Sequence, residues 1–235
     1  ETLSRLQIEA VVHFAAFALV GESVAEPAQY YRNNTAGSLS LLDAMRRAGV
    51  VQIVVSSTTA VFGVPERLPI GESDPKLPCN PYGRSKLMVE QLLQDYAAAY
   101  GFAATALRYF NAAGASPDGN LGEWHDPETH LIPLILGAAL GRRPQLTVYG
   151  SDYPTPDGSC VRDYVHVDDL ASAHLAALGR LTTGQFKAYN LGTGRGYSNL
   201  EVVDACRRVT GLPIPITIGP RRPGDPPALV ADAAL

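Results

Sequence analysis

The chain has little of several residue types and patterns, and each shortage argues against a class of protein. It contains no run of basic residues, and its net charge is −4 over 235 residues, which argues against a nucleic-acid-binding surface. No apolar stretch reaches the roughly 18 residues of a membrane-spanning helix. The three cysteines, Cys79, Cys160 and Cys206, are scattered and form no Cys-x-x-Cys pair, which is typical of reduced cysteines in a cytoplasmic protein.

The remaining composition is that of a globular protein with an alternating pattern of elements. Hydrophobic residues make up 46% and charged residues 18%, enough for one large core or two smaller ones. Buried strands are expected at 11–16, 50–57 and 103–109, and helices at 28–48, 82–100, 131–141, 167–178 and 198–210. This rhythm predicts an α/β fold, with a doubly wound parallel sheet covered by helices on both faces.

A change of character after Asn111 suggests a second unit. Residues 114–126 are rich in glycine, proline and acidic side chains, and the following segment mixes short strands with helices. We therefore expect a sheet domain at 1–111 and a smaller mixed α/β domain over most of 112–235, with segments that can return to the first sheet. In the helix expected at 28–48, Leu39, Leu42 and Met45 should share one buried face.

The most informative short motif is Tyr82-Gly83-Arg84-Ser85-Lys86. The chain has 11 tyrosines but only three lysines, so this spacing rarely arises by chance. Residues four apart share one face of a helix, which places an ammonium beneath a phenol. Bringing a tyrosine from its usual pKa near 10 to about 7 requires roughly 4 kcal/mol of preference for the phenolate, and a fixed cation can supply much of it. The pair therefore predicts a general base.

Two polar residues lie where the predicted strands end. Thr58 closes the second apolar run, after Ser56 and Ser57, and Asn111 follows the third. Ligands of parallel α/β sheets bind beyond the carboxyl ends of the strands. Both residues are therefore candidates for chemistry, although a threonine at a strand end can equally well cap the local backbone.

A set of longer runs carries a family resemblance. The runs are His13-Phe14-Ala15-Ala16, Val20-Gly21-Glu22-Ser23, Tyr31-Arg32-Asn33-Asn34, Ser56-Ser57-Thr58, Pro81-Tyr82-Gly83-Arg84-Ser85-Lys86, Arg108-Tyr109-Phe110-Asn111, His130-Leu131-Ile132-Pro133, Asp152-Tyr153-Pro154-Thr155, Val161-Arg162-Asp163-Tyr164 and Arg221-Arg222-Pro223-Gly224-Asp225. With these runs in this order, the chain resembles the extended short-chain dehydrogenase/reductase superfamily. Within that superfamily it resembles the UDP-glucose 4-epimerase family along nearly its whole length. The resemblance implies a Rossmann-like sheet, bound NAD and a homodimer.

The same resemblance implies an isomerase mechanism with three catalytic residues. Tyr82 would take the proton of the sugar 4-hydroxyl, Lys86 would lower the pKa of the phenol and hold the nicotinamide ribose, and the Thr58 hydroxyl would bind the reacting oxygen. Family members usually carry serine where Thr58 stands. Threonine keeps the hydroxyl but adds a methyl group and stiffens the side chain.

Binding residues follow from the resemblance in the same way. The implied NAD contacts are Phe14, Ala15, Ala16, Phe17, Asn33, Thr58, Tyr82, Lys86 and Phe110. The implied UDP-sugar contacts are Thr58, Tyr82, Asn111, His130, Leu131, Thr147, Val148, Tyr149, Arg162, Arg222 and Asp225. Guanidinium groups suit the diphosphate and a carboxylate suits a ribose, although Arg222 in a proline- and glycine-rich loop could equally be a solvated charge.

Two other patterns are set aside. The run Gly192-Thr193-Gly194-Arg195-Gly196 has the wrong spacing for a dinucleotide fingerprint and is expected to be a turn. No metal is expected, because the acidic and histidine residues between Glu123 and His130 do not keep the spacing of a helical metal site.

Some alternatives remain open at this level. Another UDP-sugar 4-epimerase, acting on UDP-glucuronate or UDP-arabinose, would share the Tyr/Lys chemistry, and a non-catalytic dinucleotide-binding regulator would share the fold. A 4,6-dehydratase would need an Asp-Glu pair where Thr59-Ala60 stands. No glycine-rich turn precedes Tyr82, so we expect the sequence to be a fragment that lacks the first strand-turn-helix units and some C-terminal residues. Expressed alone, such a fragment is expected to bind no NAD and to show no epimerase activity.

Overall fold

The computed structural model describes residues 1–234, and Leu235, the last residue of the predicted second domain, lies outside the described part. The chain forms a four-stranded parallel sheet with the order β1-β2-β3-β7. Its strands are β1 (Ala10–His13), β2 (Gln52–Thr58), β3 (Ala103–Tyr109) and β7 (Phe186–Leu191). In register, Val54 of β2 pairs with Val12 of β1 and Thr105 of β3.

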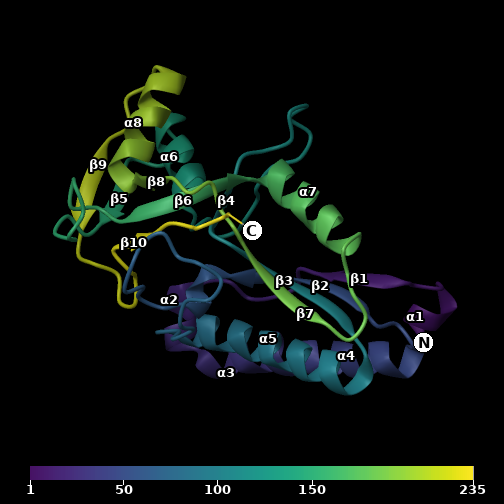
Figure 1. Cartoon of the computed structure of the whole chain (residues 1–235). Helices are drawn as coiled ribbons and strands as arrows, with labels where there is room; N and C mark the ends of the chain where they lie inside the picture. Colours follow the sequence, from purple (N-terminus) through teal and green to yellow (C-terminus); the bar gives the residue numbers. More distant parts are fainter. Residues whose placement is uncertain (235) are drawn as a thin grey trace.

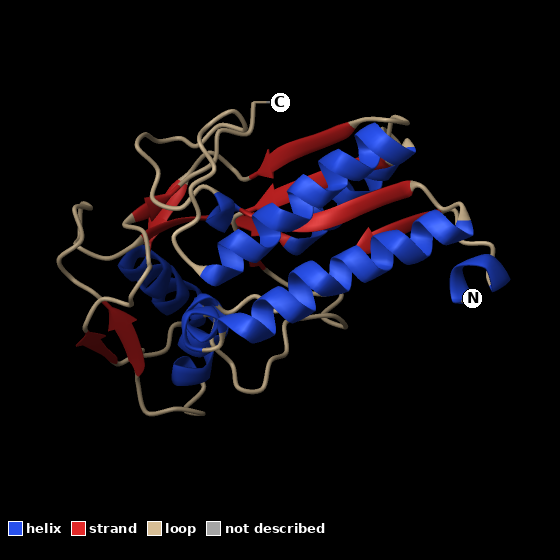
Figure 2. Cartoon of the chain, turned by 90° about the horizontal axis from the view of Figure 1, so that it is seen from below, coloured by secondary structure: helices blue, strands red, loops and turns tan. Residues whose placement is uncertain are grey.

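Helices cover both faces of this sheet, which confirms the predicted Rossmann-like α/β fold. One face carries α3 (Pro27–Tyr30), α4 (Gly37–Ala48) and α5 (Pro81–Tyr100), and the other carries α7 (Val167–Leu178) (Figure 1). Figure 2, seen from below, shows the long helices of the first face lying in front of the sheet and running along the strands. Leu42, Met45 and Leu93 pack on Ile53 in the main core, whereas Ala177 packs on the opposite face of the sheet.

A smaller unit of short strands and helices lies beyond the carboxyl ends of the sheet, at the left of Figure 1. It contains β4 (Asn111–Ala113), β5 (Leu146–Tyr149), β6 (Val161–His166), β8 (Gly196–Ser198), β9 (Ile216–Gly219), β10 (Ala228–Leu229), α6 (Leu131–Ala139) and α8 (Asn199–Thr210). β6 is the centre of one small sheet, and β5 pairs with β9 in another. Because β7 returns to the first sheet between β6 and β8, the chain crosses between the two units more than once.

The short elements α1 (Thr2–Arg5), α2 (Val20–Ala25), a π-helical turn (Tyr31–Ala36) and a 3-10 turn (Thr59–Val61) complete the fold. β3 and α7 have the predicted bounds, and α8 begins with a capping box, in which Ser198 and Glu201 bind each other's backbone N–H groups. Within the described residues, no helix is both long and apolar enough to span a membrane.

Three sequence-based predictions are wrong in detail. The first strand ends at His13 and is half-buried, and Phe14 is 59% exposed. The helix expected at 28–48 is interrupted by the π-helical turn. Leu39 is 39% exposed. Residues three apart in a helix point about 60° away from each other, so Leu39 lies outside the face that Leu42 and Met45 bury.

Candidate active site

The end of β2 and the start of α5 meet at a close backbone contact. Asn80 caps α5 by accepting a hydrogen bond from the Gly83 amide at 2.9 Å. A Cβ atom at Gly83 would lie 2.4 Å from the carbonyl oxygen of Ala60, so only glycine allows this approach. Tyr82, the second residue of α5, is thereby brought next to Thr58 at the carboxyl end of β2.

Tyr82 has a pKa opposite in direction to the one expected. Burial raises the pKa of Tyr82 to about 12, the hydrogen bond to the Thr58 hydroxyl acts to lower it, and Tyr109 adds a smaller upward effect. Lys86 is not among the groups that shift this pKa, and the expected effect of Lys86 on the base stays a prediction. The phenol ring packs edge-on against Tyr30, with 6.4 Å between ring centroids.

Lys86, one turn further along α5, binds a backbone carbonyl. Its Nζ donates to the carbonyl oxygen of Ser56 at 2.9 Å, and the residue is 6% exposed. Burial lowers the pKa of Lys86 to about 8, and the Glu90 carboxylate acts to raise it. This hydrogen bond fixes the ammonium at the end of β2, next to Ser57 and Thr58.

A buried polar cluster next to this site joins β2, β3 and α5, and it was not predicted from the sequence. Arg108 and Glu90 form an ion pair in which both side chains are about 5% exposed, with an Arg108 Nε to Glu90 Oε1 distance of 2.9 Å. The Ser57 hydroxyl donates to the same carboxylate at 2.5 Å. Since Ser57 precedes Thr58 and Glu90 lies one turn after Lys86, the pair fixes the strand end relative to the helix.

The predicted cofactor residues of the first loop lie at the carboxyl edge of the sheet. Phe14, Ala15 and Phe17 are exposed directly after β1, and Ala16 is half-buried. Phe110 is 9% exposed and packs in an apolar cluster.

The π-helical turn holds the end of this loop against α5. Asn34 is buried in this turn, whereas Asn33, a predicted NAD contact, is exposed. Asn34 accepts from the Phe17 amide at 2.8 Å and donates to the Ser85 hydroxyl at 3.0 Å. Asn34 therefore joins the predicted cofactor loop to the helix that carries Tyr82, and its place in the run Tyr31–Asn34 was the signal available in the sequence.

The predicted cofactor residues gather at one edge of the sheet. An exposed loop with two aromatic side chains follows β1, and Tyr82, Lys86 and Thr58 lie at the ends of neighbouring elements on the same edge of the sheet. This edge is where doubly wound sheets bind their ligands.

A second polar group, made of Tyr149, Arg162, Arg222 and Asp225, lies in the smaller unit. Arg162 on β6 forms an ion pair with Asp225, and its other terminal nitrogen donates to the Val161 carbonyl at 2.7 Å. The guanidinium of Arg222 stacks over the ring of Tyr149, with 4.1 Å to its centroid. The structure thus brings four of the predicted substrate residues into two contacting pairs.

The other predicted substrate residues are more dispersed. Thr147 is half-buried on β5, whereas the Val148 side chain is 1% exposed and packs in the core with Ile135, so side-chain contact with a substrate is excluded there. Leu131 packs against the edge of the same core. His130 is exposed at the N-cap position of α6, and Asn111 is half-buried at the start of β4.

Two contacts join the halves of the site. The Cys79 thiol donates to the Gly224 carbonyl at 3.7 Å, which ties the loop of Arg222 and Asp225 to the residue before the cap of α5. Leu229 packs with Phe110 and pairs in register with Arg162. The catalytic and substrate candidates therefore lie on adjoining segments.

The glycine-rich run at 192–196 has a different role, as expected. The amides of Thr193 and Gly194 donate to the Asp163 carboxylate at 2.9 and 3.0 Å, so these groups are already occupied. A Cβ atom at Gly192 would lie 2.3 Å from Ala231 Cβ, which explains the glycine by packing.

A Tyr/Lys pair beside a strand-end hydroxyl on a doubly wound parallel sheet defines a class, the dinucleotide-dependent enzymes of the short-chain dehydrogenase/reductase type. Comparison with known proteins agrees: the chain belongs to the NAD dependent epimerase/dehydratase family, which matches residues 1–192. The predictions of NAD as the cofactor and of this fold are thereby confirmed.

Individual relatives are similar over nearly the whole chain. UDP-glucose 4-epimerase of Lacticaseibacillus casei is 52% identical over 234 residues, which cover 99% of this chain and 71% of that protein. The crystal structure of UDP-glucose 4-epimerase from Brucella ovis in complex with NAD has a TM-score of 0.94 at 55% identity, covering 99% and 72%. The enzyme from Bifidobacterium longum in complex with NAD+ and UDP has a TM-score of 0.95 at 45% identity, covering 99% and 70%. The expectation of an isomerase is confirmed by these relatives.

Proposed function

We propose that this chain carries the catalytic residues of a UDP-glucose 4-epimerase, which interconverts UDP-galactose and UDP-glucose by transient oxidation at position 4 of the sugar. The observation that supports it most strongly is the placement of Tyr82 beside the Thr58 hydroxyl, with Lys86 one helical turn further on. UDP-glucose 4-epimerases of three bacteria are 50–54% identical to the chain.

Each catalytic residue has a distinct task in this proposal. Bound NAD+ supplies the acceptor and donor of the hydride at carbon 4. Tyr82 accepts the proton of the 4-hydroxyl and later returns it, and Thr58 holds the reacting oxygen by a hydrogen bond. Because both steps use the same groups in opposite directions, the net reaction is an isomerisation of the sugar after the keto intermediate has turned over.

The raised pKa of Tyr82 sets a requirement on its surroundings. Burial raises this pKa, so a base that works near neutral pH needs a cation close to the phenolate. Lys86, one helical turn from Tyr82, is proposed to supply that cation.

The second polar group suits the nucleotide diphosphate. Guanidinium groups bind phosphate oxygens through paired, charge-assisted hydrogen bonds, and Arg162 and Arg222 are the candidates. Asp225 is proposed to bind a ribose hydroxyl. Since Arg162 is paired with Asp225 in the ligand-free protein, UDP binding should exchange this ion pair for contacts to the ligand.

The assay is conversion of UDP-galactose into UDP-glucose by the NAD-bound protein, with UDP-glucuronate and UDP-arabinose as competing substrates. Preference for UDP-galactose supports the proposal. Turnover of the uronate or the pentose alone would support the alternative 4-epimerases, and NAD binding without turnover of any of the three would support the regulator. Cytoplasmic location and a homodimer remain predictions.

A further inference from the structure

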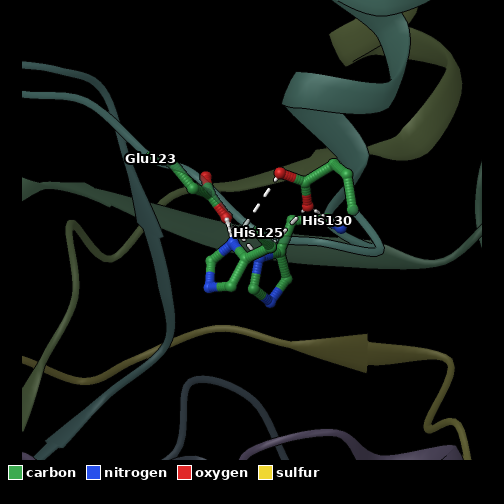
Figure 3. Close-up of side chains that lie close together, drawn as sticks. Glu123, His125 and His130 are labelled. Carbon is green, nitrogen blue, oxygen red and sulfur yellow. Dashed lines mark hydrogen bonds and ion pairs between the residues drawn. The ribbon is translucent and has the colours of Figure 1, made fainter.

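Four side chains with metal-binding atoms come together in the loop that leads into α6. Glu123, His125, Glu128 and His130 each place one nitrogen or oxygen atom within 4.8 Å of the others. Figure 3 shows the Glu123 carboxylate facing the imidazoles of His125 and His130. The sequence analysis set a metal aside because the spacing is not helical, but residues 123–130 form a loop, to which the helical spacing rule does not apply.

The distances between these atoms resemble those between the ligands of one small ion. Zinc binds histidine nitrogen and carboxylate oxygen at about 2.0–2.2 Å, so neighbouring ligand atoms of a tetrahedral site lie roughly 3.3–3.6 Å apart. His125 Nδ1 lies 3.2 Å from Glu123 Oε1 and 3.7 Å from Glu128 Oε2. His130 Nδ1 lies 3.7 Å from Glu128 Oε1 and also contacts Glu123 Oε1 directly. A bound ion would take the place of that direct contact.

The chemistry of the donors favours a transition metal. Imidazole nitrogen suits zinc, copper, iron and nickel, whereas sites for calcium or magnesium are built from oxygen ligands alone. Two carboxylates would balance the charge of a divalent cation. The imidazole rings meet edge to face with centroids 4.9 Å apart, so both Nδ1 atoms reach the same space without stacking of the rings.

The surrounding backbone holds one of the carboxylates in place. Glu128 Oε1 accepts hydrogen bonds from the amides of Thr129 and His130 at 2.7 and 2.8 Å. These two bonds hold the carboxylate just before α6, with its second oxygen turned toward His125. Such contacts beyond the ligands orient the donors of metal sites.

We propose that Glu123, His125, Glu128 and His130 form a binding site for one divalent transition-metal ion of the zinc type. The site is separate from the Tyr82 chemistry, and its existence does not depend on the proposed function. Coordination through Nδ1 leaves Nε2 of His130 free to donate a hydrogen bond, which is compatible with the predicted contact of His130 with the substrate.

The test is zinc binding to the untagged protein. The protein is first treated with a chelator, and zinc retained after equilibrium dialysis is then measured by mass spectrometry. The wild type should bind one Zn²⁺ per chain. Glu123→Gln and His125→Gln should each weaken binding at least about 100-fold, since loss of an outer-shell partner alone costs 10–100-fold. Co²⁺ added in place of zinc should show the intense visible bands of a tetrahedral site, and these bands should disappear in both variants.

A matched control is available in His166, an exposed histidine that faces a single carboxylate, Asp168, at 3.7 Å. His166→Gln should leave the zinc stoichiometry and affinity unchanged. Circular dichroism checks that each variant is folded, including His166→Gln, which changes the N-cap of α7; Glu123 and His125 lie in an exposed loop. Absence of stoichiometric zinc in the wild type, or equal weakening by His166→Gln, would overturn the proposal and leave a cluster held only by ion pairs.

Discussion

Replacing Lys86 by methionine should change how the stability of the protein depends on pH. Lys86 is 6% exposed, and burial lowers its pKa to about 8 from an ordinary value of 10.5. Below pH 8 the lysine is protonated in both the folded and unfolded states, and the folded state bears the full cost of burying the charge. Between pH 8 and 10.5 the folded state loses the proton first, so the wild type gains stability relative to Lys86→Met as pH rises.

The size of this gain follows from the shift in pKa. A difference of about 2.5 units corresponds to about 3 kcal/mol, an upper estimate for a group that interacts with Glu90. The measurement is urea unfolding of both proteins in the NAD-free form at several values of pH from 7 to 10.5. Other groups that titrate in this range, such as Tyr82 and Tyr109, are present in both proteins and cancel in the difference unless they are coupled to Lys86.

The exposed Lys187 on β7 provides the control. The difference in unfolding free energy between the wild type and Lys187→Met should stay constant over the same pH range. The unfolding free energies of the wild type and Lys86→Met could instead change equally with pH. Lys86 would then not be held as a desolvated cation in the fold, and the account of its position below Tyr82 would be wrong.

Three other perturbations test the surroundings of the site. Glu90→Ala should destabilise the protein by about 3–5 kcal/mol in urea unfolding, because Arg108 is left buried without its partner; a loss below about 1 kcal/mol would contradict a tight buried pair. Gly83→Ala should lower epimerase turnover, since the added Cβ clashes with Ala60. Gly71→Ala, where an added Cβ meets nothing within 4 Å, should lower it less, and equal turnover of the two variants would argue against the close contact at Gly83. The family resemblance implies that Leu229 lies beside the 2-substituent of the sugar, where a bulky side chain that cannot hydrogen-bond should favour UDP-galactose over UDP-N-acetylgalactosamine; equal kcat/KM on the two sugars would remove this idea.

The elements that position the catalytic residues were predictable because their signals are local. The continuous apolar runs gave β2 and β3, and the spacing of Tyr82 and Lys86 placed both on one helix, α5. The interruption of the helix at 31–36 was not predictable in this way. It depends on Asn34, which turns inward to bind Phe17 and Ser85, and these partners lie 17 and 51 residues away in the sequence.

The hydrogen-bond partner of Lys86 could not be predicted from the sequence either. Helical spacing correctly places a lysine near a tyrosine, but whether the ammonium contacts the phenol depends on competing acceptors, and here the Ser56 carbonyl accepts its hydrogen bond. The approach of the four side chains in the loop at 123–130 could not be predicted for a related reason. Spacing rules for metal sites apply to regular elements, whereas a loop can bring together donors at any spacing.

The central claim, that Tyr82 is the base of an epimerase, is tested most directly by Tyr82→Phe in the NAD-bound enzyme. The substitution removes only the hydroxyl and keeps the ring that packs against Tyr30, so the fold and the bound NAD should be retained. Loss of a general base typically costs 10²–10⁴-fold, and conversion of UDP-galactose to UDP-glucose should fall by at least about 100-fold. Near-normal turnover by the phenylalanine variant, with NAD still bound, would contradict the account.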